Sequence, residues 1–60
     1  MNKKQAKYIF RGTANLSKAL GISAQAIQQW PDQLTTKQSD WVTGAALRLN
    51  IRLEYPEDLK

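Results

Sequence analysis

The sequence predicts a mostly α-helical domain of four to five short helices, and it leaves a short C-terminal strand open. Apolar residues recur at helical spacing over most of the chain, and residues that begin or end helices separate these stretches. Only residues 51–55 show the alternation of apolar and polar residues that is typical of a strand. A chain of 60 residues suffices for one thin core, because at this length about 60% of the unfolded surface is buried. We therefore expect residues 1–60 to form a single domain.

Two short helices are expected in the first third of the chain. Asn2 is a suitable cap for the first helix, and Arg11-Gly12 marks its end. Thr13 is expected to cap the second helix, which ends at Gly21 because glycine adopts the left-handed conformation without steric cost. The apolar residues at helical spacing are Ala6, Ile9 and Phe10 in the first helix and Leu16, Ala19 and Leu20 in the second.

Two further helices are expected before residue 50. Ser23 is the expected cap of the third helix, which should run to Trp30 because Pro31 prevents its continuation. The Thr-x-x-Gln pattern of residues 35–38 is a capping box, so the fourth helix should begin near Thr36. One broad arc of this helix is apolar and is expected to face the core: Trp41, Val42, Ala45, Ala46 and Leu49.

The C-terminal tail, residues 50–60, carries the strand-like alternation. It is expected to pair antiparallel with a second copy across a twofold axis near Leu53, to fold back on its own core, or to extend the fourth helix. The first hypothesis sets Arg52 against Glu54 of the partner and predicts a homodimer. The residues of that dimer interface would be Leu47, Ile51, Leu53 and Tyr55.

Composition argues against catalysis and metal binding. The chain has no cysteine and no histidine, which removes disulfides, thiolate ligands and the commonest general base. We therefore expect no enzyme activity, no metal site, no cofactor and no small-molecule substrate. No apolar run approaches the roughly 20 residues that a membrane span needs, and no signal-peptide pattern follows the N-terminal lysines. We expect a cytoplasmic protein without membrane contact.

The positive charge is concentrated in the first half of the chain. Residues 1–30 contain five basic residues and no acidic one, whereas residues 31–60 contain four basic and five acidic residues. A field of one sign favours a polyanionic partner such as DNA, because each neutralised phosphate releases counterions. Lysine-rich helices are also common as plain solvated surfaces, so charge alone leaves both interpretations open.

Residues 13–30 have the apolar spacing of a helix-turn-helix, in which two short helices are joined by a sharp turn. Gly21 falls at the expected turn, and small residues such as Ala19 and Ala26 would allow the two helices to approach closely. The sequence therefore predicts a compact helix-turn-helix domain. The inward positions of the motif are Leu16, Leu20, Ile22, Ile27 and Trp30.

The outer face of the third helix carries three glutamines. Gln25, Gln28 and Gln29 share one arc when residues are placed about 100° apart, and Ile27 points the opposite way. A glutamine amide offers a donor beside an acceptor, which matches N6 and N7 of adenine in the major groove. We therefore expect base contacts here, although glutamine is also an ordinary neutral residue on helix surfaces. Ala24, at the edge of this face, would either touch a thymine methyl or let the backbone approach.

Phosphate contacts are expected from residues that flank this face. Helix N-termini attract anions because their first amides lack partners and the helix dipole is positive there. Such contacts orient the protein on DNA and carry no sequence information. The expected phosphate-contacting residues are Thr13 and Asn15 at the start of the second helix, Lys18 on its surface, and Thr35, Thr36 and Lys37 at the start of the fourth.

The stretches FRGT (10–13), LSKALGIS (16–23) and AIQQW (26–30) resemble the Cro-type repressors of lambdoid bacteriophages. The resemblance covers the first half of the chain well and the rest loosely. It implies a dimeric transcriptional repressor, associated with the nucleoid of a bacterial host cell, with the second motif helix in the major groove. Ser17 departs from the alanine usual at its position but is small enough to fit. The base-contacting residues that the resemblance implies are Ser23, Ala24, Gln25, Gln28 and Gln29.

The resemblance leaves the architecture of the second half open, because Cro relatives end either in helices or in a β-hairpin. The expected fourth helix, with no second strand after residues 51–55, favours the mostly helical group.

Two functions remain open. The first is a homodimeric repressor that occupies a palindromic double-stranded DNA operator and dimerises in solution or only on DNA. The second is a protein-interaction module, such as an antitoxin or antirepressor, whose binding would depend little on the glutamines or on salt.

Overall fold

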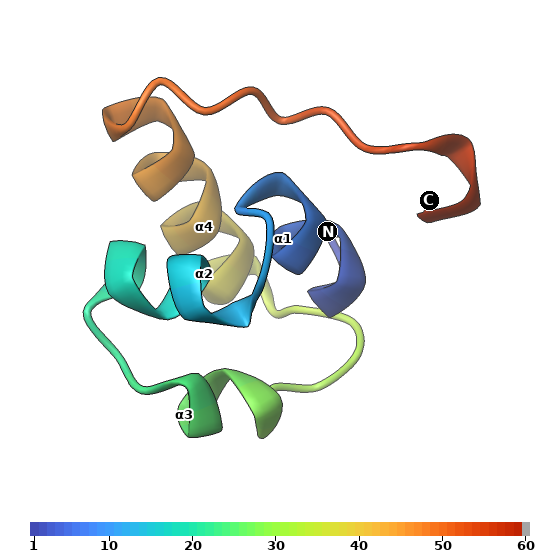
Figure 1. Cartoon of the computed structure of the whole chain (residues 1–60). Helices are drawn as coiled ribbons and strands as arrows, with labels where there is room; N and C mark the ends of the chain where they lie inside the picture. The colour runs from blue at the N-terminus through green and yellow to red at the C-terminus, as the bar shows by residue number, and fades with distance from the viewer. Residues whose placement is uncertain (60) are drawn as a thin grey trace.

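The computed structural model describes residues 1–59 and contains four α-helices, of which the first three are joined by short turns and the last two by a longer loop (Figure 1). They are α1 (Lys3–Ile9), α2 (Thr13–Leu20), α3 (Ala24–Gln28) and α4 (Thr36–Arg48), and a 3-10 turn, η1 (Glu57–Leu59), follows near the C-terminus. In residues 1–59 the only β pairing is an isolated bridge between Asn2 and Gln33. The predicted mostly α-helical fold class is confirmed.

Side-chain caps begin three of the four helices. The Asn2 side chain accepts from the Gln5 amide at 2.8 Å, and the Gln5 side chain accepts from the Asn2 amide at 2.8 Å. Thr35 and Gln38 form the same reciprocal capping box at the start of α4, with distances of 3.0 and 3.1 Å. The Ser23 hydroxyl caps α3. The expected caps of the first, third and fourth helices are therefore confirmed.

The expected cap of α2 is wrong by one residue. Gly12 is the N-cap, without a side-chain cap, and Thr13 is the first residue of the helix. The chain reaches α2 through Arg11 at φ 59° and Gly12 at φ 126°, and glycine adopts the second conformation most easily. The tight turn after α1 therefore places the cap position on a residue that has no side chain to offer.

Left-handed residues end α1, α2 and α4. After α1, Gly12 N donates to Lys7 O at 2.8 Å while Arg11 occupies the left-handed position, which is the Schellman arrangement. Asn50, at φ 58°, has the same role after α4. Gly21, at φ 71°, ends α2 as expected. These turns satisfy carbonyl groups that would otherwise lack partners at the helix ends.

The third helix is shorter than expected. It ends at Gln28 and not at Trp30, because Trp30 N turns to Ile27 O at 3.0 Å and leaves the helical pattern. A residue before proline is disfavoured in the α-helical region, so Pro31 affects the backbone before its own position.

The core lies around α2, which packs against α1, α3 and α4. The Cα radius of gyration is 10.3 Å, close to the value of about 10 Å expected for a folded chain of this length. The longest helix, α4, has 13 residues, and none of the helices within residues 1–59 is long and apolar enough to span a membrane. The buried apolar residues are Ala6, Ile9, Phe10, Leu16, Leu20, Ile27, Leu34, Val42, Ala45 and Ala46.

The expected inward arc of α4 is only partly right. Val42, Ala45 and Ala46 are buried, but Trp41 is 45% exposed and Leu49 is 48% exposed. The two alanines allow α4 to approach α2 along a narrow face, and a domain of this size has too few elements to cover both edges of the helix. Trp41 instead lies beside Trp30, with ring centroids 6.3 Å apart.

The tail beyond α4 runs in an extended conformation across one end of the molecule (Figure 1). It forms no strand within residues 51–59, because a lone extended segment needs a neighbour to pair with. Ile51 and Tyr55 pack against the core of their own chain, as the fold-back hypothesis predicted. Arg52 pairs with Glu54 of the same chain at 3.7 Å. The expected short strand is therefore not present in the single chain.

Candidate nucleic-acid interface

The short helix α3 presents its glutamines to solvent and its apolar residue to the core. Gln25, Gln28 and Gln29 are exposed, whereas Ile27 has no exposed surface. Gln29 caps the helix with φ −83° and ψ −6°, which is still right-handed helical geometry, so it continues the α3 face. Ser23 is exposed at the start of the helix, and Ala24 is half-buried beside it. We call these five residues the α3 face.

Tertiary contacts hold α3 in place, since a helix of five residues is unstable alone. At its start, the Ser23 hydroxyl accepts from the α3 backbone at 3.1 Å. At its end, Lys3 Nζ donates to Gln28 O at 3.2 Å and to Trp30 O at 3.1 Å. This positive charge also lies at the negative end of the helix dipole. With Ile27 buried between them, both ends of the α3 face are attached to the rest of the domain.

The N-terminal segment also holds the loop that follows α3. Lys3 N donates to Asp32 O at 2.8 Å, and Leu34 N donates to Met1 O at 3.1 Å. The Gln33 side chain adds a bond to Met1 O at 3.2 Å. Residues 1–3 therefore fix the path of the chain from α3 to α4.

Three of the expected phosphate-contacting residues lie on α2. Asn15 and Lys18 are exposed, and Thr13 is half-buried in the first turn. Because the N-cap Gly12 has no side chain, the first amides of α2 have no side-chain cap hydrogen bond. Amides of this kind are suited to an anion.

The other three lie at the start of α4, where Thr35, Thr36 and Lys37 are all exposed. The Thr35 hydroxyl accepts from the Gln38 amide at 3.1 Å, which leaves its hydrogen available to donate to a phosphate oxygen. The capping box occupies the amides of Thr35 and Gln38, so Thr36 and Lys37 provide the remaining amides of the first turn.

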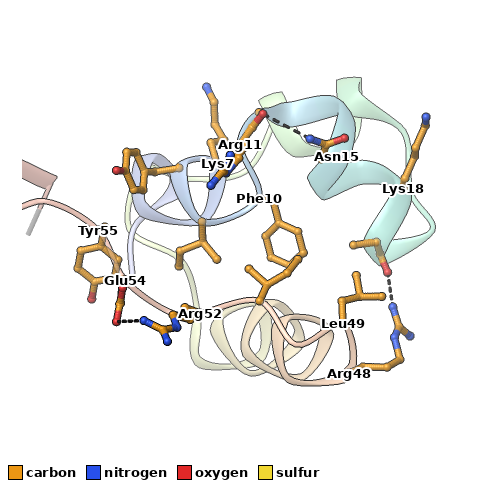
Figure 2. Close-up of a pocket in the computed structure, with 15 residues that line it drawn as sticks. Lys7, Phe10, Arg11, Asn15, Lys18, Arg48, Leu49, Arg52, Glu54 and Tyr55 are labelled. Carbon is orange, nitrogen blue, oxygen red and sulfur yellow. Dashed lines mark hydrogen bonds and ion pairs between the residues drawn. The ribbon is translucent and has the colours of Figure 1, made fainter.

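Three of the five basic residues of the first half line a groove to which the α3 face does not contribute. Lys7, Arg11 and Lys18 line a groove that we call the tail groove, between the tail and the ends of α1, α2 and α4 (Figure 2). Within the described residues, none of those that line the tail groove belongs to the α3 face. Lys3 bonds to the end of α3 instead. Basic residues that lie close together in the sequence therefore occupy separate sites in the fold.

Sequence reasoning missed two side chains that position the helices. Lys3 bonds to carbonyls 25 and 27 residues away, and Arg48 Nη2 donates to Ala19 O, 29 residues away, at 2.7 Å. No local pattern signals such partners. Gln5, in contrast, was detectable, because Asn-x-x-Gln at residues 2–5 follows the spacing of a capping box.

The fold and the α3 face define a small helical domain with an exposed, uncharged amide surface on its shortest α-helix. No protein-family model, no curated protein and no solved structure matches the chain. Function is therefore inferred from the residues of the chain itself.

Proposed function

We propose that the chain is a sequence-specific transcriptional repressor that binds a double-stranded DNA operator and inserts α3 into the major groove. The observation that carries this proposal is the exposure of Gln25, Gln28 and Gln29 opposite the buried Ile27. Each amide that pairs with an adenine edge contributes about 1–3 kcal/mol of discrimination between bases. Ser23 and Ala24 complete the proposed base-contacting surface at the start of the helix.

The starts of α2 and α4 would hold the DNA backbone on either side of α3. Thr13, Asn15 and Lys18 would contact phosphates from α2, and residues 35–37 would do so from α4. The net charge of +4 favours association with a polyanion at any sequence. Backbone contacts would orient the domain, and the glutamines would select the site.

A homodimer is part of this proposal, formed in solution or only on DNA. Leu47 is 68% exposed and Leu53 is 39% exposed, so both are accessible to a second copy. Ile51 and Tyr55, which pack on their own core, would extend the same interface. A twofold dimer would contact two half-sites about 34 Å apart on one face of the duplex. Repression would follow from occupation of the promoter.

The proposal is tested by selecting bound sites from a random duplex library. The wild type should enrich a palindrome, and Gln25→Ala, Gln28→Ala and Gln29→Ala should each relax selection at one position of each half-site. Gln33→Ala is the control for loss of an exposed glutamine outside the α3 face. Because the Gln33 side chain also bonds to Met1 O at 3.2 Å, thermal unfolding of this variant is compared with that of the wild type. Selection of the same palindrome by all three α3 variants would refute base contacts by this face.

Salt dependence tests the backbone contacts separately. Lys37→Ala should weaken binding to every duplex and lower the slope of log affinity against log salt by about one unit. Lys37 is preferable to Lys18 for this test, because Lys18 also lines the tail groove. An unchanged slope, together with unchanged site selection in the glutamine variants, would favour the protein-interaction module.

A further inference from the structure

The tail groove is a concave surface of which the proposed DNA contacts involve only Asn15 and Lys18. Its volume is about 1400 Å³, and it is lined by α1, the α1–α2 turn, α2, the end of α4 and the tail. Pockets for small molecules usually measure about 300–1,000 Å³, so this one is large for such a ligand. Its size is better matched to a segment of polypeptide.

The floor of the tail groove is apolar. Ile9 and Phe10 are buried, and Ala19 and Ile51 are half-buried. Leu49 remains 48% exposed although it is a large apolar side chain at the end of α4. Apolar surface of this kind is stabilised when a partner covers it.

The rim of the tail groove is basic. Figure 2 shows Lys7, Arg11 and Lys18 along one side and Arg48 and Arg52 along the other, with Phe10 and Leu49 between them. Among the described residues that line the groove, Glu54 is the one acid, and it pairs with Arg52 at 3.7 Å. Arg48 donates to a neutral carbonyl of α2 and so keeps its charge. Four positive charges therefore remain without a neutralising acid in the groove.

We propose that the tail groove docks an acidic segment of a partner protein, with large apolar side chains between its carboxylates. The carboxylates would contact the basic rim, and the apolar side chains would cover Leu49 and Phe10. Charge complementarity favours an acidic partner, and the apolar floor favours a polypeptide over a DNA backbone, which has phosphates but no apolar side groups. Asn15 and Lys18 are shared with the proposed DNA contacts, so the docked segment would also weaken DNA binding. Ile51 and Tyr55 are shared with the proposed dimer interface, so it would compete with a second copy as well.

The test uses synthetic peptides labelled for fluorescence anisotropy. About nine residues suffice, since an extended chain at about 3.3 Å per residue then spans the longest dimension of the domain, 28 Å. The probe alternates Asp or Glu with Leu or Phe. One control replaces the acids by Asn or Gln, and the other replaces the apolar residues by Ser. The full chain should bind the probe in a salt-dependent way and bind both controls more weakly.

Two variants connect binding to the tail groove. Arg11→Gly removes one rim charge. Because Arg11 has φ 59°, a conformation that glycine adopts more easily than arginine, the variant should not be less stable, and a loss of binding cannot come from unfolding. It should weaken probe binding about three- to fivefold, as expected for one exposed charge pair. Leu49→Gln should weaken it by altering the floor. Lys37→Ala, which removes a charge outside the groove, should leave probe binding unchanged.

Three results would overturn the proposal. The first is that the acidic probe does not bind, or binds no better than its amide control. The second is that Arg11→Gly and Lys37→Ala bind the probe equally, while Arg11→Gly also weakens duplex binding, which would assign the rim to DNA. The third is that sedimentation equilibrium shows a dimer that excludes the probe, which would assign the groove to a second copy. None of these results depends on the sequence selection by the glutamines, so the two proposals can fail separately.

Discussion

Lys3→Met tests whether one amino group holds the end of α3. Lys3 Nζ donates to Gln28 O at 3.2 Å and to Trp30 O at 3.1 Å, and methionine keeps an apolar stem but removes both bonds. A hydrogen bond from a charged donor contributes about 1.5–3 kcal/mol to stability. Because the bond to Gln28 is exposed to solvent, we expect the two together to contribute about 1–2 kcal/mol to the free energy of unfolding.

Thermal unfolding followed by circular dichroism measures this loss. In a domain of this size, each kcal/mol lowers Tm by about 4–8 °C. Lys4→Met is the matched control, since Lys4 is the exposed neighbour on the same helix and its replacement removes the same charge. Amide hydrogen exchange locates the effect: the amides of Gln29 and Trp30, which bond back to α3 carbonyls, should exchange faster in Lys3→Met.

Equal Tm values for Lys3→Met and Lys4→Met would refute the reasoning. So would a loss of protection spread evenly over α2 and α4, because the bonds act only at the end of α3. If α3 contacts DNA bases, Lys3→Met should also relax base selection in the duplex library, whereas Lys4→Met should not.

The remaining predictions concern the turns and the tail. Arg11→Gly should raise the free energy of unfolding by about 1 kcal/mol, because arginine is strained at φ 59°. Asn50→Gly should raise it less, because asparagine tolerates φ 58°. Urea denaturation of both variants measures the difference, and equal gains in stability would contradict this prediction. Gly21→Ala should lower the free energy of unfolding by about 1–2 kcal/mol. The cause would be backbone strain alone, since a Cβ at this position meets open space. An unchanged urea midpoint would disprove the prediction. Leu53→Arg should weaken self-association in sedimentation equilibrium, and an unchanged association constant would remove the tail from the dimer interface.

Helix starts and ends were predictable wherever the responsible residues are neighbours in sequence. Asn2, Ser23 and Thr35 act as caps through bonds to residues three positions ahead, and Gly21 ends α2 through its own backbone freedom. The error at Thr13 arose because the turn after α1 is a Schellman arrangement that brings Gly12 to the cap position. That arrangement depends on Arg11 accepting a conformation that its side chain disfavours.

The exposed glutamines of α3 were predictable, and the outward edges of α4 were not. A face of α3 follows from helical spacing once Ile27 is assigned to the core, and Ile27 is indeed buried. Trp41 and Leu49 have the same apolar character as the core residues of α4, but no other element covers them. Burial depends on what lies opposite a side chain, and spacing along one helix does not contain that information.

Residues three or four positions apart were enough to establish the helices, three of their four N-caps and the outward glutamines, because these features arise within one or two helical turns. Packing of the four helices was needed to bring Lys3 to the end of α3 and to place Lys7, Arg11 and Lys18 along the tail groove. It also placed Ile51 and Tyr55 against the core of their own chain. Such contacts join residues that are distant in sequence, and the relative positions of those residues are set by the shape of the whole core.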